Sequence, residues 1–175
     1  MIAGTCKVRI YESELRAGLF NEMRSPASEE REIRYDGVHC NLIIQRFAYR
    51  VVVLRISGSD VGEFGEAPMN ALNDSVTSSD PIDLFIDARD VRGASIDVSG
   101  EWARWLGSRK PGLRTITMLT GSRFIEITAA FVRRFASLEG IMRICNDPAV
   151  FDFALAEAIK TDEKQSLKFS PTPEP

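Results

Sequence analysis

Few side chains in this sequence are of the types that catalyse reactions or bind metals. His39 is the only histidine among 175 residues, so a nucleophilic serine or cysteine has only one histidine available as its base. The three cysteines, Cys6, Cys40 and Cys145, have no CxxC spacing and cannot all pair within one chain. This pattern disfavours a disulfide framework and a zinc ribbon, and we expect reduced thiols.

Acidic side chains offer the other route to chemistry. Asp83, Asp87 and Asp90 follow one another along an expected strand and its exit loop, and oxygen ligands of this kind can bind a hard cation. Carboxylates at strand ends more often cap helices and face water. The glycine motifs GxGxxG and GxxxxGK[S/T] are absent, as is the GxSxG motif of serine hydrolases. The sequence therefore predicts no metal site, no cofactor and no enzyme activity.

The elements that would position a site occupy the middle of the chain, where apolar runs and helical periodicity alternate. We expect two neighbouring strands, possibly antiparallel, followed by three further strands that alternate with four helices; the strands are at 42–47, 51–56, 82–88, 114–120 and 141–145. This order predicts an α/β fold with a mixed, largely parallel sheet of about four to five core strands and four helices.

The two ends differ from this middle region in composition. Residues 1–35 are predicted to be a partly ordered N-terminal extension, in which Cys6, Val8 and Ile10 alternate as in a strand. Residues 36–160 are predicted to form the α/β domain. Residues 161–175 hold three prolines and little apolar surface, so we expect a disordered tail.

Charge is distributed unevenly along the chain. Residues 56–88 hold seven acids and no Lys or Arg, whereas residues 89–143 hold ten bases and five acids. The segregation fits solvated faces, or electrostatic steering toward a charged protein partner or a second copy. The net charge of −3 disfavours a general nucleic-acid binder. No apolar run is long enough for a transmembrane segment, so we expect a cytoplasmic protein.

The expected helix at 123–138 carries more apolar surface than one face of a sheet needs. Phe124, Ile127, Phe131, Phe135 and Leu138 form one stripe, and Ile125, Ala129, Val132 and Ala136 form a second beside it. Such a helix is either deeply buried or covered by a partner. Within it, Phe131, Val132 and Phe135 are the candidate contacts with a protein partner or in a homodimer.

The segment IDLFIDARDVRGASIDVSGEWARWL, residues 82–106, resembles the STAS-like domain of anti-sigma-factor antagonists and the related CRAL-TRIO-like small bacterial proteins. The similarity extends over about residues 39–159. It rests on the order of elements, on Asp87 at an acidic strand end, and on the ending MRICNDPAVFDFALAEAI. The resemblance implies a STAS-like fold and a regulatory, non-enzymatic role.

Regulatory members of this family carry a phosphorylated Ser or Thr directly after an Asp. The nearest match here is Asp97-Val98-Ser99-Gly100, which places Val98 at the acceptor position. A helix N-terminus with a nearby hydroxyl still favours phosphate, so Ser95 and Ser99 stay candidates for phosphorylation. Alternatively, Asp97 or Ser95 is simply the N-cap of the helix.

Two functions are open at this point. The first is a protein-interaction module that binds its partner through the loop and helix at 95–109, with Ser95, Asp97, Ser99, Trp102 and Trp105 as candidate contacts. The alternative, which the CRAL-TRIO side of the resemblance implies, is a small-molecule or lipid carrier. In that case Trp102, Trp105, Phe124 and Phe131 would line an apolar cavity.

Overall fold

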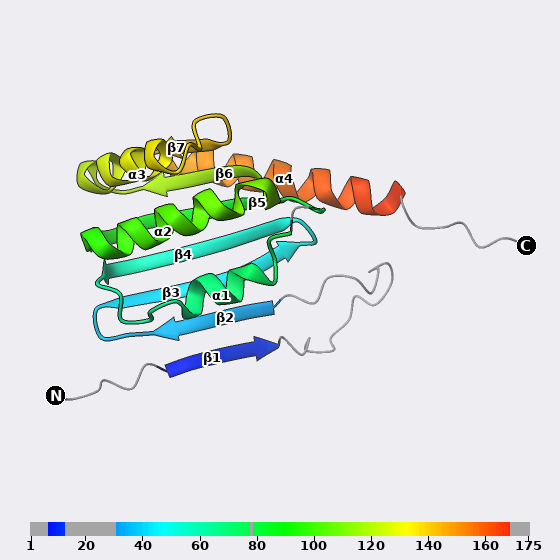
Figure 1. Cartoon of the computed structure of the whole chain (residues 1–175). Helices are drawn as coiled ribbons and strands as arrows, with labels where there is room; N and C mark the ends of the chain where they lie inside the picture. The colour runs from blue at the N-terminus through cyan, green and yellow to red at the C-terminus, as the bar shows by residue number, and fades with distance from the viewer. Residues whose placement is uncertain (1–6, 13–30, 78, 169–175) are drawn as a thin grey trace, which may run out of the picture.

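The computed structural model describes residues 7–12, 31–77 and 79–168 (Figure 1). This part of the chain forms seven strands, four α-helices and a short 3₁₀ turn: β1 (Lys7–Glu12), β2 (Arg31–Asp36), β3 (Cys40–Ala48), β4 (Val51–Asp60), α1 (Ala67–Asn73), β5 (Ile82–Ala94), α2 (Ile96–Arg109), η1 (Lys110–Gly112), β6 (Leu113–Thr120), α3 (Arg123–Phe135), β7 (Met142–Cys145) and α4 (Pro148–Lys168).

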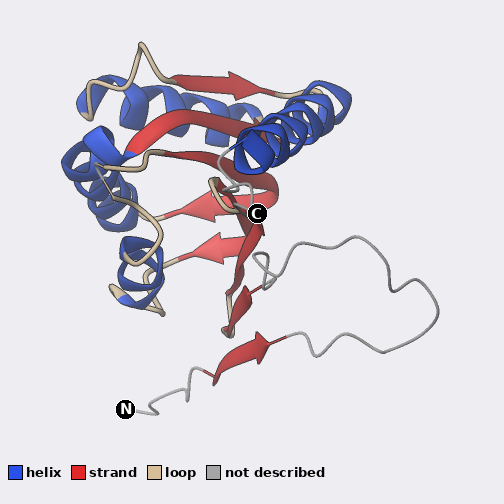
Figure 2. Cartoon of the chain, turned by 90° about the vertical axis from the view of Figure 1, so that its right-hand side faces the viewer, coloured by secondary structure: helices blue, strands red, loops and turns tan. Residues whose placement is uncertain are grey.

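The seven strands form one sheet in the order of the sequence. Strands β1 to β4 pair antiparallel, as expected for the first hairpin of the domain, and β4 to β7 pair parallel. Each parallel step moves one strand further in the same direction. Because crossovers share one hand, α1, α2 and α3 all lie on the same face of the sheet (Figure 2). Helix α4 follows the last strand and lies on the opposite face.

Two hydrophobic clusters hold these layers together. Under α1, α2 and α3, the strand residues Leu54, Leu84 and Ile116 are all 0% exposed. Under α4, Val51, Val53, Phe85 and Leu119 surround Phe151. Strand β4 contributes to both clusters through alternate side chains, which is why its sequence is an unbroken apolar run rather than an alternating one.

The predicted α/β class, the mixed sheet and the four helices are confirmed. The expectation of a largely parallel sheet of four to five strands is corrected, because the seven described strands form three antiparallel and three parallel pairs. The alternation at Cys6, Val8 and Ile10 predicted a strand, and β1 lies there. The expected boundary after residue 35 is corrected, because β2 pairs with both β1 and β3 and crosses it. Strand β2 is rich in charged residues, so its composition does not indicate an amphipathic strand, although its Tyr35 is buried. Residues 1–6 and 13–30 lie outside the described residues.

The expected tail from residue 161 is also corrected, because α4 continues to Lys168. Asp162 is only 2% exposed and accepts a hydrogen bond from the backbone N–H of Arg50 at 3.2 Å. The Arg50 guanidinium donates to Gln165 Oε1 at 3.0 Å. These contacts hold the polar last turns of α4 against the β3–β4 turn. Composition alone does not distinguish such a polar helix end from a disordered tail. Residues 169–175 lie outside the described residues.

Candidate functional site

The start of α2 brings together three of the residues singled out in the sequence. Ser95 is the N-cap, and its Oγ accepts a hydrogen bond from the Val98 N–H at 3.2 Å. The Ser99 hydroxyl donates to the Ser95 carbonyl at 2.8 Å. Asp97 lies exposed in the first turn, where a carboxylate suits the helix dipole. The N-cap is therefore Ser95 and not Asp97, and both hydroxyls serve the helix itself.

The two tryptophans of α2 have different environments. Trp105 is 8% exposed, and its indole Nε1 donates to Asn73 Oδ1 at 2.9 Å. It belongs to the core, so its role as a candidate surface contact is corrected. Trp102 is half-buried, with its ring perpendicular to that of Trp105 at a centroid distance of 5.9 Å. Trp102 is therefore the tryptophan within reach of a ligand or partner.

Helix α3 uses its two apolar stripes differently. Ile125, Ala129 and Val132 are buried against the sheet, and Leu138 beyond the helix end is buried too. Val132 is therefore a core residue rather than a partner contact, because it lies on the sheet side of the helix. The outer stripe consists of large side chains that are each about 60% exposed: Phe124 58%, Ile127 60%, Phe131 61% and Phe135 63%. Helix α3 is therefore not buried as a whole, and only two of its three candidate contacts, Phe131 and Phe135, are exposed.

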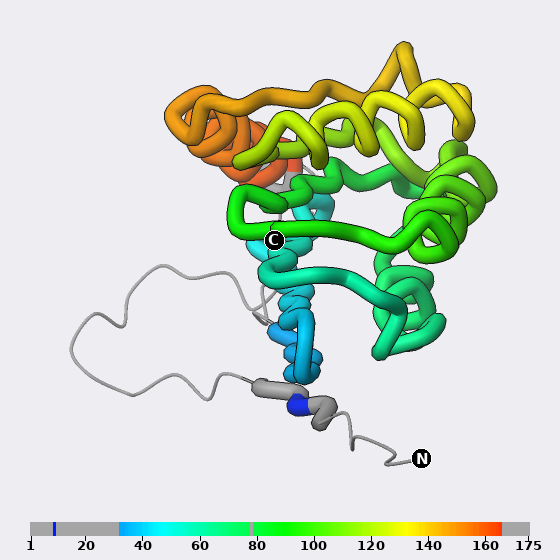
Figure 3. The backbone as a smooth tube through the Cα atoms, turned by 90° about the vertical axis from the view of Figure 1, so that its left-hand side faces the viewer, coloured from blue at the N-terminus to red at the C-terminus, as the bar shows by residue number. Residues whose placement is uncertain are grey.

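Helices α2 and α3 lie side by side (Figures 1 and 3). Residues of both helices line one cavity, and the space between the helices over this cavity is called here the α2–α3 groove. Near its closed end, a Cβ at Gly107 would lie 3.6 Å from the Cβ of Ala136. Near its open end, a Cβ at Gly100 would meet nothing within 4 Å. Between these points lies an apolar cavity of ≈ 90 Å³, lined by Val98, Ser99, Trp102, Leu106, Ile125, Thr128, Val132 and side chains of the sheet.

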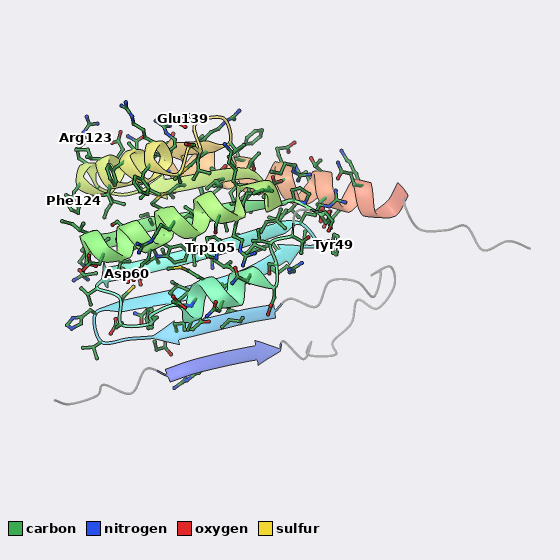
Figure 4. All side chains as sticks on the ribbon, viewed as in Figure 1. Tyr49, Asp60, Trp105, Arg123, Phe124 and Glu139 are labelled. Atoms are coloured by element: carbon green, nitrogen blue, oxygen red, sulfur yellow. The ribbon has the colours of Figure 1, made fainter. Side chains whose placement is uncertain are left out.

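The exposed stripe of α3 borders this groove. Phe124, Thr128, Phe131 and Phe135 follow one another at intervals of four, three and four residues, so they share one side of the helix. Because Thr128 lines the cavity opposite Ser99 and Trp102, this side faces α2. Figure 4 shows Phe124 at the N-terminal end of α3, on the side of α2. The groove therefore has an aromatic wall on α3 and a wall of small residues on α2.

The cavity does not match the one expected for a carrier. Of the four aromatic residues proposed to line it, only Trp102 does so. Trp105 lies in the core, and Phe124 and Phe131 lie on the surface. Its volume of ≈ 90 Å³ is well below the roughly 300–1,000 Å³ of pockets that enclose drug-sized ligands. The space under the groove is thus too small for a lipid.

Bases surround the groove, in agreement with the uneven charge of the sequence. Arg104, Arg123 and Arg134 are exposed on the outer sides of α2 and α3. Arg123 is paired with Glu126 at 3.2 Å, yet its side chain stays 80% exposed. Arg109 and Lys110 lie exposed at the C-terminal end of α2. The rim of the groove is therefore mostly cationic, with Asp97 as the exposed acid of the two helices and with Glu101 and Glu126 half-buried.

The acidic segment 56–88, by contrast, is not a uniform surface pole. Glu63 accepts hydrogen bonds from the N–H groups of three residues of the β2–β3 turn and β3, at 2.7 to 3.0 Å. Asp60 accepts from the Gly62 N–H. Asp83 is 5% exposed and is bound by Arg114 and Thr115. Several of its acids therefore serve internal contacts, which does not favour steering by this segment.

Two of the three carboxylates considered as metal ligands have other partners. Asp83 is held by Arg114, and Asp87 pairs with Arg89 at 2.9 Å. Among the described residues, no group of three or more His, Cys, Asp or Glu side chains is placed to hold a metal ion. None of the helices in the described ranges is long and apolar enough to span a membrane.

Comparisons with known proteins identify the fold. No family model matches the chain, and no curated protein is significantly similar to it in sequence. Among solved structures, the chain is similar to a DUF3478-family protein with a SpoIIAA-like fold from Shewanella loihica PV-4, with a TM-score of 0.50 and 12% identity. The match covers 69% of this chain and 97% of that one. The fold is therefore SpoIIAA-like, that is STAS-like, as the resemblance predicted.

Sequence reasoning missed the α2 wall of the groove. Gly100, Ala103 and Gly107 recur at intervals of three and four residues, which puts small residues on one side of α2. This spacing was the available signal for a close helix–helix approach. Ile96, at 90% exposed, was also missed, although it adds apolar surface at the start of the same helix.

Proposed function

We propose that this protein is a non-enzymatic, cytoplasmic, regulatory interaction module whose α2–α3 groove binds an amphipathic helix of a partner protein. The observation that carries the proposal is the exposed stripe of Phe124, Ile127, Phe131 and Phe135. The largest exposed apolar patch on a monomeric protein is often functional, because such patches are the usual sites of protein contact. The proposal moves the centre of the site from residues 95–109 alone to the groove that α2 shares with α3.

The shape of the groove supports a helical occupant. Amphipathic helices bind by placing side chains at i, i+3, i+4 and i+7 into an apolar groove. The open space above Gly100 leaves room for one row of such side chains, and Trp102 and Thr128 line the cavity beneath. The stacked rings of Phe131 and Phe135, 5.9 Å apart, provide a flat wall for a second row.

The rim charges support a partner with acidic flanks. Arg104 lies on one side of the groove, and Arg134 lies three residues beyond Phe131 on the other. Rim charges mainly accelerate association and select the partner, whereas buried aromatic side chains supply most of the affinity. The partner segment should therefore alternate apolar residues with Asp and Glu, and it should associate more slowly at high salt.

The available apolar area is consistent with a transient complex. An aromatic side chain can bury about 150–250 Å², so four large side chains at about 60% exposure offer roughly 450 Å². A standard interface takes about 800 Å² from each partner. The stripe would supply more than half of this area, and the arginines and α2 would supply the rest.

Affinity capture from the native host with matched variants tests this function. We expect Phe131→Ser combined with Phe135→Ser to abolish capture of a specific protein while the far-UV spectrum stays unchanged, because both side chains are exposed. Phe153→Ser is the matched control, since Phe153 on α4 is 69% exposed and lies on the opposite face. Loss of capture in the control alone would contradict the proposal. So would concentration-dependent dimerisation of the purified chain through Phe131.

A further inference from the structure

A second cavity, larger and more polar, is lined by residues 89–92 of β5 and by their neighbours. Its volume is ≈ 660 Å³, and its lining includes His39, Asn41, Ser57, Arg89, Arg92 and Ser122. It is called here the β5 pocket. Its lining residues belong to the C-terminal halves of β4 and β5, to the start of β3 and the turn before it, and to the β6–α3 loop. Its size falls within the range of ligand sites.

The pairing of β5 explains why basic side chains reach this pocket. Between β4 and β5 the register shifts twice, once between Arg55 and Ser57 and again between Gly58 and Ser59. At each shift β5 has an extra residue, and such bulges bend a strand and redirect its side chains. The bulged segment carries both Arg89 and Arg92, which are thereby presented to the same pocket.

Two glycines fix the walls of the pocket. Gly58 has a φ of +87°, and a Cβ there would lie 2.2 Å from the carbonyl oxygen of His39. A Cβ at Gly121 would lie 2.0 Å from the carbonyl oxygen of Arg89. The backbone of β4 therefore packs directly against the turn before β3, and the backbone of the β6–α3 loop packs directly against β5. The side chains that line the pocket are mounted on a closely packed frame.

The polar groups of the pocket favour an anion. Arg92 makes no hydrogen bond or ion pair with any described residue, and its guanidinium has five donors. Arg89 uses its Nε to bind Asp87 at 2.9 Å, and one of its terminal nitrogens lies 3.8 Å from Asp152. Asp90 is the acidic residue among those that line the pocket.

The N-terminus of α3 adds backbone donors on the same side. The cap at Ser122 uses the N–H groups of Ile125 and Glu126, at 3.2 and 3.0 Å. The first turn of a helix also has other N–H groups, which favour a negative charge nearby. Because Ser122 lines the pocket, this helix end and Arg92 lie around one space.

We propose that the β5 pocket binds the phosphate group of a small phosphorylated, hydroxyl-bearing molecule. Arg92 and Arg89 donate to the phosphate, and His39 lies on the opposite wall as a further donor. Asp90 and Asn41 accept hydrogen bonds from hydroxyl groups of the ligand. This site is separate from the α2–α3 groove, and its occupation does not depend on the proposed partner.

Titrations followed by the backbone amide resonances of the full chain test this proposal, with inorganic phosphate, ribose 5-phosphate and ribose as the ligands. We expect both phosphates to shift the Gly58 and Gly121 signals, and ribose 5-phosphate to bind more tightly than inorganic phosphate. Ribose alone should shift neither signal. Equal affinities for ribose 5-phosphate and for ribose would show that the phosphate is not recognised, and would overturn the proposal.

A pair of variants locates the site. Arg92→Gln should weaken ribose 5-phosphate binding about tenfold or more, because a hydrogen bond to a charged group is lost. Arg109→Gln is the matched control, since Arg109 is exposed at the far end of α2 and does not line the pocket. Equal affinities of Arg92→Gln and the original chain would overturn the proposal. So would the absence of binding, or shifts confined to residues outside the pocket.

Discussion

The indole of Trp105 on α2 donates a hydrogen bond to the side-chain oxygen of Asn73 on α1, at 2.9 Å. A tryptophan can be buried to this degree at low cost only if its N–H finds an acceptor. The bond also joins two helices that lie next to each other on the same face of the sheet. It therefore fixes the rotation of α2 and, with it, the position of Trp102 in the groove.

We expect Asn73→Ala to destabilise the protein by about 1–3 kcal/mol, because the buried indole N–H loses its acceptor. Urea denaturation measures this change. Asn70→Ala is the control, since it removes only an exposed side-chain bond to Asn73, of 3.3 Å, and leaves the tryptophan contact intact. Equal free energies of unfolding for the two variants would show that the Trp105 bond does not contribute.

The same substitution at two neighbouring residues of α3 should have very different effects on stability. Val132→Glu puts a charge at a site that is 7% exposed, so we expect the free energy of unfolding to fall by several kcal/mol or the protein not to fold. Phe131→Glu changes a side chain that is 61% exposed and should leave stability within about 0.5 kcal/mol. Thermal unfolding distinguishes them. Similar melting temperatures would contradict the assignment of the two stripes.

Removing one partner of the Arg114–Asp83 ion pair should cost more stability than replacing both partners by apolar residues. Asp83 is 5% exposed and is bound by Arg114 Nε at 2.9 Å and by Thr115 Oγ1 at 2.8 Å. Arg114→Met leaves this carboxylate without its cation and should cost about 3 kcal/mol. Adding Asp83→Leu should restore most of the lost stability. A double variant less stable than Arg114→Met would contradict this interpretation.

The Cys40 thiol should make stability depend on pH in alkaline solution. Burial, together with the charges of Asp60 and Glu63, raises the pKa of this thiol to about 12. The unfolded chain then releases the proton at lower pH than the folded chain. Stability is therefore unaffected below the ordinary thiol pKa and falls above it, by up to about 1.4 kcal/mol per pH unit.

Urea denaturation of the original chain and of Cys40→Ala, at pH 7 and at pH 10, measures this effect. The original chain should lose more stability between these two pH values than the variant. An equal loss in both proteins would show that Cys40 titrates normally in the folded state. Because Cys40 is 1% exposed, we also expect a thiol reagent at pH 8 to modify it only after unfolding.

The sequence predicts the five strands from β3 to β7 and the four helices because their apolar patterns are long and bounded by Gly, Pro or Asn-Asp-Pro. It does not reveal the boundaries of the domain. Strand β2 places Tyr35 in the core but has charged residues on its other face, and the end of α4 depends on Asp162 and Gln165 meeting Arg50 across the fold. Contacts between residues so far apart leave no local pattern.

The candidate site shows the same limit. The two stripes of α3 are visible from spacing, but which stripe is buried depends on how the helix is rotated over the sheet. Without that rotation, the sequence does not show which of Val132 and Phe131 is buried. Likewise, spacing alone does not distinguish the two tryptophans of α2, because the side chain that accepts from Trp105 is Asn73 of α1. The β5 pocket depends on two strand bulges, which the sequence does not signal.

In-cell photo-crosslinking tests the central claim most directly. A photoreactive phenylalanine analogue is placed at Phe131, in the α2–α3 groove, or at Phe153, on α4; both sites are more than 60% exposed, so neither replacement should disturb the fold. We predict that illumination links the chain to one specific protein from position 131 and not from position 153, and that the linked peptide is an acidic amphipathic segment. No adduct from position 131, or the same adduct from both positions, would contradict the account.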